Sequence, residues 1–414
     1  MLTSANPAIE PKRSARPRVL ISTLAPSPGG VTVMRRFIVD CLRRKGFEPV
    51  LAFYQPYSLA PRLSVPSYAL ATRRPGCDET SVEEMESHAS GAWLPELEFT
   101  HYLATNHWKR VIASCDFHVG VVGCCLQVLP FASSDTPFLA WVATPWESDR
   151  AERALELPLL RRALDRVIVR PGARRVERRV LQSGRFLALS EYTRGELDRI
   201  AGRPVVSNIL AMPIDSSVFS PCPERVEPGL VGFVGRFADG RKNVGLFLRS
   251  MAALRRAGAQ VRGILIGGKP TQALLKQVRE LGLHDSLQFL DFLPRAEVAS
   301  LLPRIDVFVI PSHQEGLCIA GLEAMAAGCP VVSTRCGGPE EFVLDGETGY
   351  LTGFDADEIA KTVGSIVADR PLRDRLAAGA RRLIETKYSF AAAEALFWAE
   401  FDKTFSREKT CLQS

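Results

Sequence analysis

The segment between Asp306 and Thr334 constrains the fold more than any other part of the chain. The apolar run Asp306–Ile310 predicts a buried parallel strand, because strands covered on both faces are apolar throughout. A polar loop follows, then a stretch rich in Leu, Glu, Ala and Met that predicts a helix. Val331–Thr334 predicts the next strand. Such alternation indicates a mostly parallel sheet that helices cover on both faces.

Two glutamates, Glu315 and Glu323, stand in this segment, one in the loop and one in the helix. Eight residues of helix span roughly 12 Å, about the distance from the sugar to the ribose of a nucleotide sugar. The helix N-terminus lies between the two carboxylates, and its free N–H groups and dipole favour a diphosphate. The segment therefore predicts a ligand cradle at the carboxyl end of a sheet.

The same segment resembles the Glu-x7-Glu signature of the family-4 retaining glycosyltransferases, which have the GT-B fold. Pro-Ser before the signature, Glu-Ala-Met-Ala from its second glutamate on and Gly337-Gly338 after it also match. The resemblance implies that Glu315 faces the donor sugar and that Glu323 holds the ribose hydroxyls. It assigns the following loop residues to donor binding: Gly316, Leu317, Cys318 and Ile319. The plain alternative is a loop carboxylate and a surface residue of an ordinary helix.

Two cations, Arg236 and Lys242, follow the apolar run that begins at Leu230. Fixed cations that face a cleft stabilise a leaving diphosphate without a metal ion. The pair matches the family pattern, and with Glu315 it forms the set of residues that the resemblance makes catalytic. The alternative is that both are surface residues near a turn.

Two further positions match the family less specifically. Gly30, in the turn Pro28-Gly29-Gly30-Val31, allows a phosphate or sugar to approach the backbone closely. Phe292 belongs to a run that lies over the donor base in relatives, although core packing explains these residues equally well.

The chain departs from the family at other positions. Where relatives often have a histidine that contacts the donor sugar, this chain has Thr144 and Trp146. Trp146 fits either stacking on a sugar ring or simple packing. His118 is expected to be a core residue, and Cys318 replaces a glycine close to the donor sugar.

The chain of 414 residues is long enough for two domains. We expect a disordered arm over residues 1–17 and a Rossmann-like acceptor domain over 18–207. After these we expect a Rossmann-like donor domain over 208–386. The last segment, 387–414, is expected to be a helix that crosses back onto the N-terminal domain, as in the family, with a tail. Residues 57–100 predict long loops with one helix. No apolar run reaches the roughly 18 residues that span a bilayer.

Neither a cofactor nor a metal ion is expected. The ten cysteines and six histidines show no spacing typical of a zinc site, and a reduced, cytoplasmic compartment fits best. Asp355-Ala356-Asp357 resembles a metal motif, but Asp355 precedes a helical pattern and fits a helix N-cap instead.

Nine arginines stand between Arg161 and Arg185, against only Asp165 and Glu177, in a chain with a net charge of +6. A solvated helical face is one interpretation. A surface for phosphorylated acceptors or a peripheral contact with anionic lipid at the inner face of the membrane is the other. Nucleic acid is not an expected partner, because no aromatic residues interleave with the arginines.

These observations together predict an α/β protein with two Rossmann-like domains and a metal-independent retaining glycosyltransferase activity. The sugar of a UDP- or GDP-sugar would pass to the hydroxyl of a sugar or lipid-linked acceptor, in polysaccharide, glycolipid or glycoside synthesis. Two alternatives stay open at this stage: a nucleotide-sugar epimerase of the same fold, and a catalytically silent partner subunit that still binds the nucleotide.

Overall fold

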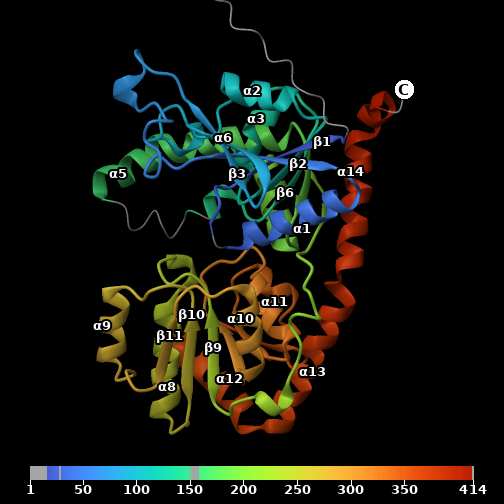
Figure 1. Cartoon of the computed structure of the whole chain (residues 1–414). Coiled ribbons are helices and arrows are strands. Elements are labelled where there is room, and N and C mark those ends of the chain that lie inside the picture. Colours follow the sequence, from blue (N-terminus) through green and yellow to red (C-terminus); the bar gives the residue numbers. More distant parts are fainter. Residues whose placement is uncertain (1–15, 28, 149, 151–157, 413–414) are drawn as a thin grey trace, which may run out of the picture. The chain divides into compact units, whose positions relative to one another are not determined.

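The computed structural model describes residues 16–27, 29–148, 150 and 158–412 (Figure 1). The chain divides into two compact units. The first comprises Met1–Ala140, Ser183–Arg185 and Phe401–Ser414, and the second comprises Trp141–Gln182 and Phe186–Glu400. Only residues 16 and 17 of the predicted arm are among the described residues. The domain boundaries predicted at 207 and 386 stay predictions.

An eight-stranded sheet occupies the N-terminal half of the chain, in the order β3-β4-β2-β1-β5-β6-β7-β8. β1 pairs in parallel with both β2 and β5, and only β3, at the edge, is antiparallel to its neighbour among the described pairs. The mostly parallel arrangement predicted from the sequence is therefore confirmed. The strands are β1 (Arg18–Thr23), β2 (Glu48–Tyr54), β3 (Cys77–Val82), β4 (Met85–Ser90), β5 (Phe117–Val122), β6 (Leu139–Val142), β7 (Arg185–Ala188) and β8 (Val206–Ile209).

The prediction of long loops and one helix between residues 57 and 100 is wrong, because β3 and β4 form a hairpin there. Glu83 and Glu84 make its two-residue turn with φ angles of 50° and 63°. A turn of this kind usually carries Asn or Gly, so the sequence gives no sign of it. Arg35 and Arg36 of the first helix bind the Glu83 carboxylate at 3.2 and 2.7 Å, which holds the turn in place.

A second, six-stranded sheet has the order β11-β10-β9-β12-β13-β14, and every described pair in it is parallel. The chain builds outward from β9 to β11, returns to place β12 on the other side of β9, and then continues to β14. The boundary between β9 and β12 is thus the point where the strand order reverses. The strands are β9 (Leu230–Val234), β10 (Arg262–Ile266), β11 (Leu287–Leu290), β12 (Val307–Ile310), β13 (Val331–Thr334) and β14 (Gly349–Thr352).

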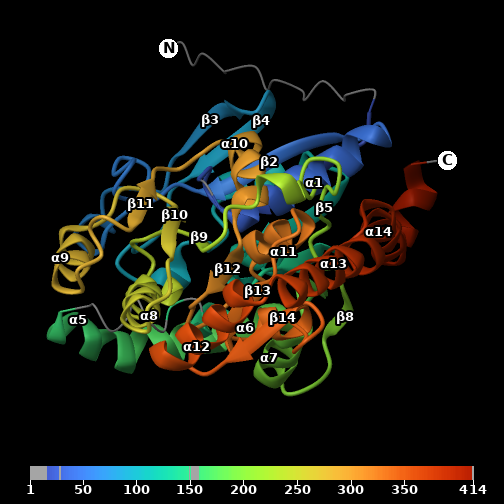
Figure 2. The same ribbon diagram turned by 90° about the horizontal axis from the view of Figure 1, so that it is seen from below.

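Helices connect the strands, as the alternating sequence pattern predicts. α11 and α13 contact each other in the second unit (Figure 2). The helices of the N-terminal half are α1 (Gly30–Arg44), α2 (Asn106–Ala113), α3 (Leu129–Ala132), α5 (Leu159–Leu164), α6 (Arg170–Leu181) and α7 (Glu191–Ala201). Those of the C-terminal half are α8 (Val244–Arg256), α9 (Gln272–Glu280), α10 (Arg295–Leu301), α11 (Ile319–Ala326), α12 (Ala356–Ala368), α13 (Arg370–Lys387) and α14 (Phe390–Leu412).

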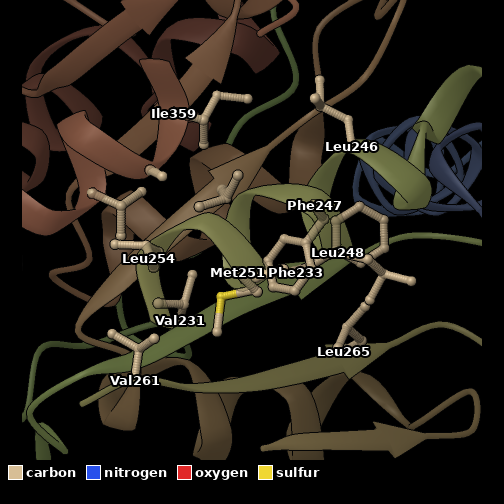
Figure 3. Packing of buried hydrophobic residues seen from close by; sticks show 14 of the residues in the cluster. Val231, Phe233, Leu246, Phe247, Leu248, Met251, Leu254, Val261, Leu265 and Ile359 are labelled. Carbon is tan, nitrogen blue, oxygen red and sulfur yellow. The ribbon is translucent and has the colours of Figure 1, made fainter. Parts of the chain in front are cut away.

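The core of the second unit lies between its sheet and the helices α8 and α12 (Figure 3). Phe233 of β9 and Leu265 of β10 meet Met251 and Leu254 of α8, and Ile359 of α12 packs in the same cluster. All five side chains are buried, and each contributes about 1.5–3 kcal/mol by leaving water. This packing fixes the strands whose carboxyl ends carry the candidate site.

The last part of α14 belongs to the first unit, from Phe401 onward. The Phe401 ring lies 5.7 Å from that of Phe47 and 5.3 Å from that of Phe117. Phe405 lies 5.2 Å from Phe117, and its own φ/ψ angles break the helix into two segments. Aromatic packing therefore holds this part of α14 on the first unit.

Candidate functional site

The predicted donor residues lie at the carboxyl ends of β9 and β12, the neighbouring strands at which the strand order of the second sheet reverses. Open parallel sheets bind ligands at such a point, because the connections on its two sides leave in opposite directions and open a crevice. Gly235 and Arg236 follow β9 directly, and the loop Pro311–Cys318 follows β12. The fold thus brings together residues about 75 positions apart in the sequence.

Lys242 and Glu315 form an ion pair at this point. Lys242 Nζ donates to Glu315 Oε1 at 2.7 Å, and Ser312 Oγ donates to the same oxygen, also at 2.7 Å. Burial would lower the pKa of the Lys242 ammonium group, but the Glu315 carboxylate beside it raises the pKa above its usual value. Lys242 is therefore a fixed positive charge at neutral pH.

Backbone hydrogen bonds hold the Glu315 loop against the segment that follows β13. Glu315 N–H donates to the Cys336 carbonyl at 2.8 Å, and Gly338 N–H donates to the Glu315 carbonyl at 2.9 Å. A Cβ on Gly338 would lie 2.3 Å from the Gly316 carbonyl oxygen, and one on Gly316 would lie 2.3 Å from the Ala143 carbonyl oxygen. The glycines are therefore required by close backbone approach, and the carboxylate is held on a rigid loop.

Cys318 caps the N-terminus of α11 in a left-handed conformation, with φ at 70°. This conformation favours glycine, which agrees with the glycine that the resemblance places here. The side chain is buried near Glu315 and Lys242, and burial raises the pKa of the thiol well above its usual range. The cysteine is therefore a neutral side chain beside the ion pair.

Only the second half of the Glu315–Glu323 interval is helical, because α11 begins at Ile319. The estimate of roughly 12 Å from an uninterrupted helix therefore does not apply. Glu323 lies within α11, with Arg295 Nε 3.3 Å from its Oε1. Burial raises the pKa of the Glu323 carboxyl group to about 7, although Arg295 opposes the shift.

Arg236 is half-exposed and pairs with Asp239 at 3.1 Å, and Arg241 pairs with the same carboxylate at 2.8 Å. Burial would raise the pKa of Asp239, but its hydrogen bond to Arg241 and the nearby positive charges lower it to about 2. His313 N–H donates to the Arg241 carbonyl at 2.7 Å, so this cluster is connected to the Glu315 loop. Arg236 itself does not contact Glu315 through any bond that the described residues show.

The remaining predicted donor residues are less closely connected. Phe292 follows β11 and is 50% exposed, and its ring would lie 3.1 Å from a Cβ added to Gly268. Leu317 is buried in the loop, and Ile319 is the first residue of α11. Gly30 begins α1 in the first unit, so its role toward a donor stays a prediction.

Several expectations about the surrounding residues can be checked directly. His118 is buried with Nε2 3.0 Å from the Ile112 carbonyl oxygen, which confirms it as a core residue. Trp146 is 3% exposed, which favours packing over stacking on a sugar. Gln314 Nε2 donates to Thr144 Oγ1 at 3.3 Å. Asp355 accepts from Glu358 N–H at 2.8 Å and is the predicted N-cap.

Three residues of the candidate donor site were not predicted from the sequence: Ser312, Asp239 and Arg295. Ser312 stands three residues before Glu315 in the recognised segment, so its position alone could have suggested a contact. Asp239 stands between Arg236 and Arg241 in the sequence, so an ion pair with these two cations could have been inferred from its position. Arg295 has no such signal, because only the fold brings α10 to α11.

The arginine-rich stretch consists of α5, a π-helical turn and α6. Its two acidic residues, Asp165 and Glu177, are buried, and Arg150 and Arg170 bind Asp165 at 2.8 and 2.9 Å. Several α6 arginines are exposed: Arg174, Arg175, Arg178 and Arg179. Lipid contact there stays a prediction. In the part of the chain that the structure describes, no helix is both long and apolar enough to cross a bilayer.

The cysteines and histidines show no grouping along the sequence, but the fold creates one. Cys77, His88 and His107 each offer a ligand atom, and these atoms lie within 4.8 Å of one another. The group belongs to the first unit and contains none of the donor residues.

Known proteins resemble this chain in both sequence and structure. The sequence model of the family described as Glycosyl transferases group 1 matches residues 220–383. The GDP-mannose-dependent alpha-(1-6)-phosphatidylinositol monomannoside mannosyltransferase of Mycolicibacterium smegmatis is 32% identical over 260 residues, which cover 55% of this chain and 68% of that protein. The MMP alpha-(1->4)-mannosyltransferase of Mycolicibacterium hassiacum is 29% identical over 409 residues, covering 92% of this chain and 97% of that protein.

Among solved structures, sucrose-phosphate synthase from Thermosynechococcus elongatus aligns with a TM-score of 0.71 at 17% sequence identity. The alignment covers 94% of this chain and 99% of that chain. The likeness confirms the predicted GT-B fold.

Proposed function

Because this chain belongs to the glycosyl transferases group 1, we propose that it transfers a sugar from a nucleoside-diphosphate donor to an acceptor hydroxyl with retention at the anomeric carbon. Mannose from GDP-mannose is the first candidate. The relative that supports this choice is named as GDP-mannose-dependent, and a second relative is also a mannosyltransferase.

The observation that carries the proposal is the Lys242–Glu315 pair at the reversal of the strand order. A sugar diphosphate needs a hydrogen-bond acceptor for its hydroxyl groups and a cation for its phosphates. The Glu315 carboxylate and the Lys242 ammonium group offer both, with Nζ 2.7 Å from Oε1. Because the two side chains neutralise each other, the site is stable before the donor binds. The donor diphosphate would then share the Lys242 charge.

In the proposed reaction, the bond between the anomeric carbon and the diphosphate oxygen breaks as the acceptor oxygen bonds to the same face of that carbon. The acceptor proton passes to the departing phosphate oxygen, so the protein needs no nucleophile of its own. Lys242 and Arg236 stabilise the charge that develops on the diphosphate, which replaces the role of a metal ion. Glu315 positions the sugar.

Glu323 is proposed to accept hydrogen bonds from the ribose hydroxyls, and Phe292 to cover the base. The backbone N–H groups at the start of α11, from Ile319 on, would bind the diphosphate together with the helix dipole. Gly316, Leu317 and Cys318 form the wall beside the sugar. Gly30 belongs to the other unit and would contact the donor phosphate or the acceptor.

The acceptor is proposed to carry a phosphate or to be anchored to a lipid. Three exposed α6 arginines, Arg175, Arg178 and Arg179, support this class because basic side chains attract anionic headgroups by about 1 kcal/mol each. Arg174 is exposed too, but it already pairs with Glu147 at 2.6 Å. A phosphatidylinositol mannoside is the first acceptor to test, since one relative is named for such a substrate.

The test is incubation with GDP-mannose, UDP-glucose or ADP-glucose, with and without phosphatidylinositol mannoside, followed by NMR assignment of the product anomer. Transfer from GDP-mannose with the donor's own α configuration is the expected result. An inverted product would contradict the retaining mechanism. Interconversion of the donor sugar without acceptor would indicate an epimerase. Binding of the donor without turnover would indicate a catalytically silent partner subunit.

A further inference from the structure

A cysteine and two histidines converge on one face of the first sheet. Cys77 comes from β3, His88 from β4 and His107 from the first turn of α2. Their candidate ligand atoms lie within 4.8 Å of one another. Thiolate and imidazole are the side-chain groups that Zn²⁺ prefers in proteins.

The strand register explains the convergence. In the antiparallel hairpin, Cys77 pairs with Ser90 and Glu79 pairs with His88. Because side chains alternate between faces along a strand, Cys77 and His88 project from the same face. His107 reaches this face from α2, and its Nε2 lies 2.9 Å from Cys77 Sγ.

The surroundings of His88 hold its ring in an orientation that suits a metal ligand. The residue is 5% exposed, and its Nε2 lies 2.9 Å from Glu86 Oε1. Its other ring nitrogen, Nδ1, is buried without a hydrogen-bond partner. Leaving a buried polar atom unpaired costs about 1–3 kcal/mol, so a bond from this nitrogen to a ligand would be stabilising. A carboxylate on the far nitrogen is the usual support of a metal-bound histidine.

We propose that Cys77 Sγ, His88 Nδ1 and His107 Nε2 bind one Zn²⁺ ion, supported by Glu86. Tetrahedral zinc with bonds of about 2.0–2.3 Å needs donor atoms about 3.3–3.5 Å apart, so the close Cys77–His107 pair opens by a few tenths of an ångström. The other candidate ligand atoms lie within 4.8 Å of one another, so the ion would draw the wider pairs closer.

The fourth position opens into a pocket of the first unit with a volume of about 1380 Å³. Cys77 and His107 both line this pocket, and so do three arginines: Arg62, Arg74 and Arg110. Three protein ligands and one open position are typical of zinc sites that bind an exogenous ligand. Asp78 and Glu79 line the pocket too, and Arg62 pairs with Asp78, which leaves Arg74 and Arg110 as the cations for an anionic ligand. The fourth ligand is then water or an oxygen of the phosphate or carboxylate class.

The test is titration of the metal-free full chain with ZnCl₂ by calorimetry, together with Co²⁺ titration followed by absorption. One ion per chain is expected, with a thiolate-to-cobalt charge-transfer band that Cys77→Ser abolishes. His107→Gln should lose most of the Zn²⁺ affinity. Glu86→Gln should weaken it by about 10–100-fold. Cys222→Ser and His284→Gln, which alter the same residue types in the second unit, should bind Zn²⁺ as the wild type does.

Circular dichroism and melting of each variant in EDTA separate lost binding from lost folding. A folded Cys77→Ser variant that binds Zn²⁺ as tightly as the wild type would overturn the proposal. So would a wild-type chain that binds no Zn²⁺, or a cobalt complex without the thiolate band. Addition of phosphate to the cobalt complex should shift its spectrum, and an unchanged spectrum would contradict the open fourth position.

Discussion

Replacing Lys242 by methionine should destabilise the chain, because the change leaves the Glu315 carboxylate buried without its cation. The Lys242 Nζ to Glu315 Oε1 distance is 2.7 Å, and the two side chains are only 19% and 9% exposed. Removing one partner of such a pair costs about 3–5 kcal/mol. Ser312 keeps its hydrogen bond to the carboxylate, which places the expected loss in the lower part of this range.

Protonation of the carboxylate sets an upper limit on the loss in the free energy of unfolding. A glutamate that titrates near 4.3 in water takes up a proton at pH 7 for about 3.7 kcal/mol, at 1.36 kcal/mol per pH unit. We therefore expect Lys242→Met to lower the free energy of unfolding by about 3–4 kcal/mol at pH 7.

The assay is urea unfolding at pH 7 for Lys242→Met, Glu315→Gln and the double variant. The double variant should be more stable than Lys242→Met at pH 7, because no buried charge remains. Lys276→Met is the matched control: its pair with Glu280 is exposed, and we expect a change within about 0.5 kcal/mol. The reasoning is refuted if Lys242→Met is as stable as the wild type, or if the two single losses simply add.

Three further predictions concern the same site. Burial raises the pKa of Glu323 to about 7, so GDP affinity by calorimetry should rise about tenfold from pH 6 to pH 8 as the carboxylate ionises, and stay constant in Glu323→Gln. Cys318→Gly should keep or raise the urea midpoint because φ is 70°, whereas Cys318→Val should lower stability by more than about 1 kcal/mol; equal midpoints would contradict this. Gly316→Ala should abolish transfer and lower the melting temperature, because its Cβ would lie 2.3 Å from the Ala143 carbonyl oxygen. Gly195→Ala, whose Cβ meets nothing within 4 Å, is the control that should do neither.

The sequence was most informative where local pattern decides the structure. The run before Pro311 had to be a buried strand, and Asp355 had to cap a helix, because neighbouring residues alone determine both outcomes. The ion pair of Lys242 and Glu315 is different. Both residues were predicted to serve the donor, but only the adjacency of β9 and β12 shows that they bind each other before any donor is present.

The hairpin of β3 and β4 could not be predicted, because its turn consists of Glu83 and Glu84 rather than Asn or Gly. Its stability comes from Arg35 and Arg36, which lie far from it in the sequence. The same hairpin creates the metal cluster. Cys77 and His88 become neighbours only through strand register, so a scan for ligand spacing along the chain misses them.

Calorimetric titration with GDP measures whether the carboxyl ends of β9 and β12 bind a nucleoside diphosphate, which the proposed transfer requires. We expect one GDP per wild-type chain. Glu323→Ala should weaken this affinity at least tenfold, because a charge-assisted hydrogen bond is worth about 1.5–3 kcal/mol. The exposed control Glu347→Ala should leave the affinity unchanged. The proposed donor site would be wrong if the wild-type chain bound no nucleoside diphosphate, or if the Glu323→Ala variant bound GDP as tightly as the wild type.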